Sequence, residues 1–138
     1  MVSLKQIDGV KFAGEVGIGI NPKLAERVRG ADLILAIGAR LGEMTTGGYT
    51  LLQAPRPVQQ LIHIHAGAEE LGRVYTGELL INASMSQAAL ALSQLTPPAD
   101  VTWRDWTAQA NADYRANLVP TPVAPLDMAE VIRLLDEK

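Results

Sequence analysis

The chain has 138 residues, a formal net charge of −3 and 48% hydrophobic residues, enough for one domain with a hydrophobic core. Its 12 Lys and Arg residues stand against 15 acidic residues without a basic run, and no apolar stretch reaches the roughly 20 residues that span a bilayer. The chain has no cysteine and begins without a signal-peptide pattern, so we expect a cytoplasmic protein that binds neither nucleic acid nor membrane.

The first predicted elements are a short helix and a strand. Asn21 is a good N-cap, Pro22 suits the first helical position and Gly30 closes the helix. An apolar stripe lies between them at helical spacing, formed by Leu24, Ala25 and Val28. The run 33–37, "LILAI", has no polar alternation, which is typical of a strand that helices cover on both faces.

The same pattern recurs downstream. Residues 61–65 ("LIHIH") and 79–83 ("LLINA") are further short strands, and "GAEELGRVY" and "SMSQAALALSQL" follow them as predicted helical crossovers. The sequence therefore predicts an α/β fold with a partial Rossmann-like parallel sheet flanked by helices. Three parallel strands are half of the usual doubly wound sheet, so we expect half a domain over residues 1–95.

A proline-rich linker with one helix is predicted over residues 96–126. Five of the eight prolines lie between Pro97 and Pro125. Thr102 and Asp105 approximate a capping box for the helix between them. One face of this helix is expected to pack against a neighbour, and it carries Trp103, Trp106, Ala110 and Tyr114.

Residues 127–138 are predicted to start a further domain. Asp127 is a good N-cap with Glu130 at the third helical position, and Leu126 can pack on Val131 as a hydrophobic staple. The apolar stripe of this helix continues to the end of the chain without a further element to cover it. We therefore expect that the chain is a piece of a longer protein, cut at both ends.

The end of the first strand is the leading candidate for a binding site. In open parallel sheets, ligands bind beyond the carboxyl ends of the strands, where Gly38 follows the strand. Arg40 offers a planar cation to a phosphate or carboxylate, and Thr45 and Thr46 add hydroxyl donors. The alternative interpretation is that Gly38 permits a tight strand exit and Arg40 forms a surface ion pair.

The sequence also carries a family resemblance. The stretch "AGEVGIGINPKLAERVRGADLILAIGARLGEMTTGGY", followed by "LIHIHAGAEELGRVY" and "INAS", resembles the second half of the central domain of thiamine-diphosphate-dependent enzymes of the acetolactate synthase type. The resemblance implies a six-stranded parallel sheet between a pyrimidine-binding and a diphosphate-binding domain. In some members this domain holds FAD or ADP. The resemblance then places Arg40 of "GAR" and the loop glycines Gly14 and Gly17 at the nucleotide. Gly38 and Thr46, named above from the end of the strand, complete the predicted site.

The chain departs from the flavin-bearing members at acidic positions. Where these often read "HIDID", this chain has His63, His65 and Ala66, and Ser84 stands where an aspartate is common. Such an acidic residue usually binds the ribose hydroxyls, so the resemblance favours an empty scaffold over a flavin site, although Glu70 matches a family glutamate.

The groups that support thiamine chemistry are not identifiable. The glutamate that protonates the pyrimidine and the Mg²⁺-binding "GDG" to "NN" stretch are missing, and "IDG" at 7–9 is a turn. The resemblance implies a lyase or carboligase for 2-oxo acids whose other domains bind thiamine diphosphate and Mg²⁺. We expect this chain to form a homo-oligomer and to be inactive alone.

The two histidines and the overall fold allow two other hypotheses. His63 and His65 share one strand face and begin a possible metal site, but no cysteine or carboxylate has a convincing ligand spacing. The runner-up function is a free-standing Rossmann-like nucleotide-binding or regulatory module.

Overall fold

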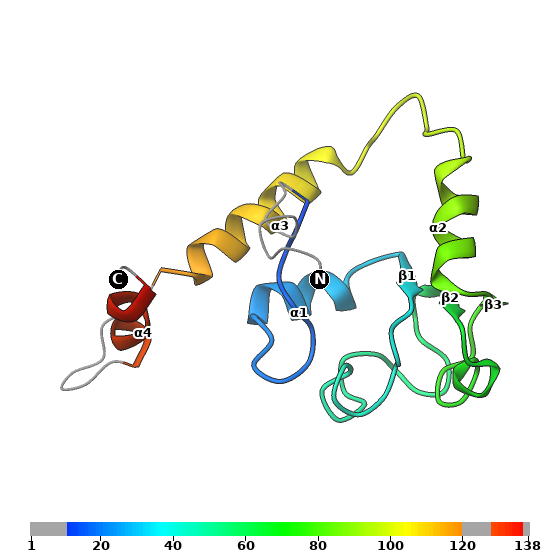
Figure 1. Ribbon diagram of the computed structural model, residues 1–138, viewed down its shortest axis with the longest axis horizontal. Helices are drawn as coiled ribbons and strands as arrows, with labels where there is room; N and C mark the ends of the chain where they lie inside the picture. The colour runs from blue at the N-terminus through cyan, green and yellow to red at the C-terminus, as the bar shows by residue number, and fades with distance from the viewer. Residues whose placement is uncertain (1–10, 120–127, 137–138) are drawn as a thin grey trace.

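A computed structural model of the chain describes residues 11–119 and 128–136 (Figure 1). The elements, in chain order, are α1 (Pro22–Arg29), β1 (Leu33–Ile37), β2 (Gln60–His65), the 3₁₀ helix η2 (Ala68–Glu70), β3 (Leu79–Asn82), α2 (Met85–Ser93), α3 (Arg104–Asn117) and α4 (Met128–Asp136). No helix within these residues is both long and apolar enough to cross a membrane.

The three strands form one parallel sheet in the order β1-β2-β3. Ala36 pairs with His63, and Ile64 pairs with Ile81, so the carboxyl ends of the strands lie at one edge. The prediction of an α/β, partial Rossmann-like parallel sheet flanked by helices is confirmed.

The predicted caps of α1 and the position of α2 are confirmed. The Asn21 side chain accepts a hydrogen bond from the Lys23 backbone N–H at 3.0 Å, Pro22 begins the helix and Gly30 ends it. Downstream of β3, the Ser84 side chain accepts a bond from the Gln87 N–H and starts α2. Short polar side chains therefore set both helix starts.

The predicted helical crossover after β2 is wrong. Only the three residues of η2 are helical there, because Leu71 is extended (φ −72°, ψ 119°) and Gly72 has a left-handed backbone (φ +74°). The connection between β1 and β2 consists of turns. Loops therefore follow β1 and β2 at the carboxyl edge of the sheet, whereas α2 follows β3.

The expectation that β1 is covered on both faces is also wrong within the described residues. Ala36 is buried and joins a core with Leu52, Leu61 and Tyr75. Leu33, Leu35 and Ile37, however, remain 44%, 45% and 44% exposed. These three side chains alternate along β1 and so lie on one face of the sheet, which is only partly covered within the described residues.

The helix α3 lies against α1 (Figure 1). Asp113, with a side chain 10% exposed, pairs with Lys23 Nζ at 2.8 Å and with Arg27 at 2.6 Å. Arg27 also lies 5.3 Å from the centre of the Trp106 ring. Tyr114 packs edge-on against Phe12, with ring centres 4.9 Å apart. Charged and aromatic contacts therefore join the linker helix to the first helix.

Two expectations about α3 need correction. Its N-cap is Trp103 and no side chain caps it, so the Thr102–Asp105 capping box does not form. Trp103 and Trp106 are about half exposed, whereas Ala110 is buried, so the predicted packing face is only partly covered.

The helix predicted near the end of the chain is present as α4. Its predicted capping residues Leu126 and Asp127 lie outside the described residues. Leu134 and Leu135 are exposed, as expected for an apolar stripe without a cover among the described residues. The boundaries 1–95, 96–126 and 127–138 stay predictions.

Candidate functional site

The turn at Gly38 sets the geometry of the candidate site. Gly38 has φ +67°, a conformation that side chains with a Cβ rarely adopt. Its N–H donates to the Ile64 carbonyl at 2.8 Å, and a Cβ at this position would lie 2.7 Å from the Met85 sulfur. The glycine therefore permits both the sharp exit of β1 and the close approach of α2.

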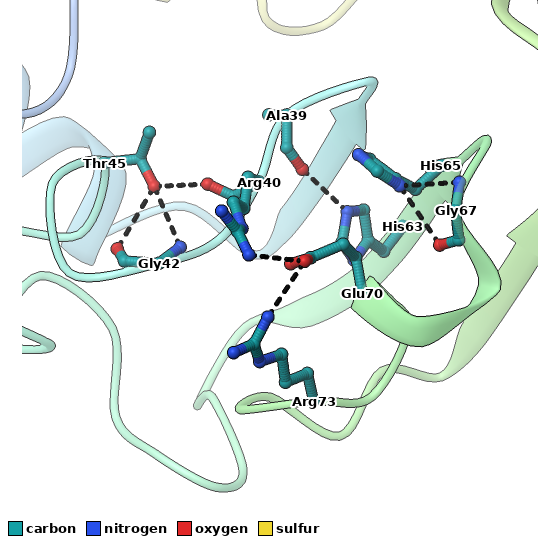
Figure 2. A network of polar contacts seen from close by, with 9 residues as sticks. All are labelled: Ala39, Arg40, Gly42, Thr45, His63, His65, Gly67, Glu70 and Arg73. Atoms are coloured by element: carbon teal, nitrogen blue, oxygen red, sulfur yellow. Dashed lines mark hydrogen bonds and ion pairs between the residues drawn. The ribbon is translucent and has the colours of Figure 1, made fainter.

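Arg40 lies in an ion cluster with Glu70 and Arg73 (Figure 2). Its guanidinium Nη2 contacts Glu70 Oε1 at 2.8 Å, and Arg73 Nη1 contacts the same oxygen at 3.0 Å. The Glu70 side chain is 11% exposed, whereas the arginine side chains are 64% and 56% exposed. Because loops follow both β1 and β2, residues 30 positions apart meet at this edge.

The electrostatics of the cluster favour the ionised forms of Arg40 and Glu70. The hydrogen bond from Arg40, assisted by the charges of both arginines, lowers the pKa of Glu70 despite partial burial of the carboxylate. The hydrogen bond to Glu70 in turn raises the pKa of Arg40. Much of the Arg40 charge is therefore balanced within the protein.

The two threonines of the loop hold its backbone. Thr45 Oγ1 donates to the Arg40 carbonyl at 2.5 Å and accepts from the Gly42 N–H at 3.2 Å (Figure 2). Thr46, 1% exposed, donates its hydroxyl to the Gly42 carbonyl at 2.8 Å. These bonds give both hydroxyls a structural role, and a nucleotide-binding role for Thr46 stays a prediction.

The structure separates the predicted glycines from one another. Gly17 (φ +119°) lies so close to the Arg40 loop that a Cβ would be 2.9 Å from the Met44 carbonyl oxygen. Gly14 (φ +112°) instead lies beside Leu24 and Tyr114, where a Cβ would be 3.4 Å from each. Gly17 thus lies against the backbone of Met44 in the loop after Arg40, and Gly14 belongs to the contact between α1 and α3.

A cavity of about 360 Å³ opens beside the ion cluster. Its lining includes neither Gly14, Gly17 nor Gly38. The side chains of interest around it are Arg40, Thr45, His63, Glu70, Arg73 and Tyr75. Of the residues predicted for the site, the cavity lining therefore includes Arg40 and Thr45 but not Thr46 or the three glycines.

The two histidines bond to backbone. His63, 2% exposed, donates its Nε2–H to the Ala39 carbonyl at 2.8 Å, and His65 Nδ1 accepts from the Gly67 N–H at 3.0 Å. Their rings are 5.9 Å apart. Within the described residues, no three His, Cys, Asp or Glu side chains are placed to hold a metal ion.

A comparison with protein families decides the family of the chain. The profile of the thiamine pyrophosphate enzyme central domain matches residues 8–95, well over half of the chain. The chain belongs to this family. No curated protein matches the sequence significantly.

Membership of the central-domain family fits the sheet and implies a parent enzyme that depends on thiamine diphosphate. The amide of Asn82 joins two strand ends at the carboxyl edge of the sheet. Asn82 Nδ2 donates to the carbonyls of His65 and Ala66 at 3.0 and 2.9 Å. It binds backbone there and ties the end of β3 to the loop after β2.

Sequence reasoning did not find Arg73, Tyr75 or the Asp113 pairs. The spacing of Glu70 and Arg73, three residues apart, was a usable signal of an ion pair. No local pattern signals a contact between Arg27 and Asp113, which are 86 residues apart.

Proposed function

We propose that the chain is the second half of the central domain of a lyase or carboligase of the acetolactate synthase type that acts on 2-oxo acids. Its role is to hold the catalytic domains in place. The parent enzyme is cytoplasmic and homo-oligomeric. Its other domains bind thiamine diphosphate and Mg²⁺, and these domains are the partners of this piece. The chain by itself is inactive.

The engagement of Arg40 by Glu70 is the observation that carries the scaffold role. A nucleotide phosphate at this edge meets a guanidinium whose charge is already balanced by the Glu70 carboxylate at 2.8 Å. The ribose lacks its usual acidic partner, since His65 and Ala66 occupy the strand end. The residues present therefore fit an FAD or ADP site poorly.

The docking of α3 supports the same role. In the proposed arrangement α3 leads toward the diphosphate-binding domain, and the Asp113 pairs hold it on α1. The Asp113 pairs thereby fix α3 relative to α1, which is the arrangement that a scaffold between domains requires.

The experiment that tests this function uses calorimetry and the parent reading frame. The 138-residue chain should show no saturable binding of thiamine diphosphate with Mg²⁺, while the parent should bind them and turn over a 2-oxo acid. The parent frame should carry "GDG" followed by an asparagine pair downstream of Lys138. A micromolar isotherm for the chain alone, or a parent without that stretch, would refute the proposal.

The alternative is a free-standing nucleotide-binding or regulatory module. The cavity beside Arg40 favours it, because a concave site with convergent polar groups is the usual form of a ligand site. A stop codon directly after Lys138, together with saturable ADP binding, would support this alternative.

A further inference from the structure

Tyr75, a residue of the cavity lining, carries a buried hydroxyl group. It is 2% exposed and packs in the core with Ala36, Leu52 and Leu61. It also lines the cavity, and its hydroxyl is buried without a hydrogen-bond partner among the described residues. Because buried hydroxyls almost always have a partner, this group offers an unused donor and acceptor in a residue of the cavity lining.

The arginines at the cavity can supply more donors than the ion cluster uses. Arg40 and Arg73 each contact Glu70 Oε1 through one nitrogen (Figure 2), whereas a guanidinium carries five N–H donors. Both side chains are more than half exposed and line the same cavity. An oxyanion is the ligand type that such forked donors recognise.

The net charge of the cavity lining sets the expected affinity for an anion. Glu43 and Glu70 balance Arg40 and Arg73, so the four side chains carry no formal net charge. An anion therefore gains directional hydrogen bonds rather than a large net attraction. We expect a dissociation constant in the millimolar rather than the micromolar range. A value of about 1 mM corresponds to a binding free energy of about 4 kcal/mol.

The size of the cavity limits the ligand. Its 360 Å³ is near the lower end of the range for ligand pockets, roughly 300–1,000 Å³. This volume suits an ion of a few heavy atoms better than a dinucleotide. We propose that the cavity between Arg73 and Tyr75 binds a small oxyanion of the carboxylate or phosphate class, a site separate from the scaffold role.

The test is a titration of the full 138-residue chain with inorganic phosphate and, separately, with acetate. Saturable amide shifts at Thr45, Arg73 and Tyr75, followed by NMR, are the expected result, and the stronger probe identifies the class of anion. Tyr75→Phe should weaken the stronger probe about 10-fold, because it removes one hydrogen bond to a charged ligand. Tyr114→Phe makes the same chemical change at the α3 contact and should leave the affinity unchanged.

Thermal unfolding gives an independent measurement. In phosphate- and carboxylate-free buffer, Tyr75→Phe should melt at or above the wild-type temperature, because the hydroxyl has no protein partner to lose. Adding the stronger probe should then raise the melting temperature of the wild type more than that of the variant.

Three results would overturn the inference. The first is the absence of shifts at the cavity up to 50-fold above about 1 mM, the expected dissociation constant. The second is a lower melting temperature for Tyr75→Phe in ion-free buffer. The third is ADP binding much more tightly than phosphate, which would assign the cavity to a nucleotide. The first two leave the scaffold proposal untouched.

Discussion

The docking of α3 on α1 predicts a specific dependence of stability on pH. The hydrogen bonds from Arg27 and Lys23 lower the pKa of Asp113 from 3.8 to about 2. A carboxylate with a lowered pKa stabilises the folded state above its unfolded value and loses this effect as the pH falls through its folded value. The contribution of Asp113 should therefore be complete above about pH 4.5 and disappear near pH 2.

The size of this stability effect follows from the pKa of Asp113 and from the exposure of its two partners. A fall from 3.8 to about 2 corresponds to at most about 60-fold in the folding equilibrium constant. Lys23 is 63% exposed, so water screens its part, whereas Arg27 is only 17% exposed. We expect that Asp113→Asn lowers the folding equilibrium constant about 10-fold at neutral pH.

Chemical denaturation of wild type, Asp113→Asn and Asp105→Asn at pH 7 and at pH 2 measures this effect. Asp105 lies on the same helix and is exposed, so its variant controls for the change in helix charge. The gap between wild type and Asp113→Asn should be about 10-fold at pH 7 and close at pH 2. An equal gap at both pH values, or the same loss in Asp105→Asn, would refute the reasoning.

Two further predictions concern the sheet edges. Glu70→Gln releases two guanidinium groups, so it should tighten phosphate binding about 10-fold relative to Glu78→Gln, an exposed control, in a calorimetric titration. Equal affinities of the two variants would show that Glu70 does not restrain Arg40. The half-exposed Leu33, Leu35 and Ile37 on an edge strand predict concentration-dependent association in analytical ultracentrifugation, which Leu35→Lys should suppress. A wild-type chain that stays a compact monomer at all concentrations would count against an open edge.

Local sequence patterns were enough for the strands and for the caps of α1. The run 33–37 is β1, residues 60–65 and 79–82 are the other strands, and Asn21 starts α1 because its side chain reaches a backbone N–H group nearby. These features depend on interactions within a few residues, which the sequence records directly.

The features that sequence reasoning missed depend on the fold. A periodic pattern suggested a helix after β2, but the left-handed Gly72 prevents it. Full burial of β1 was inferred from its apolar run. Such a run indicates that the strand needs cover on both faces, but it does not show that this chain provides the cover. The cavity joins residues from two loops, and its buried Tyr75 hydroxyl carries no local signal. Long-range contacts of this kind follow only from the three-dimensional structure.

The central claim, that this domain is a scaffold without a nucleotide, is tested most directly by calorimetric titration of the full-length parent enzyme with ADP and with FAD. The account predicts no saturable binding of either nucleotide to the wild type or to Arg40→Ala. A micromolar isotherm for ADP or FAD that Arg40→Ala weakens by about one to two orders of magnitude would contradict it and make Arg40 a nucleotide ligand.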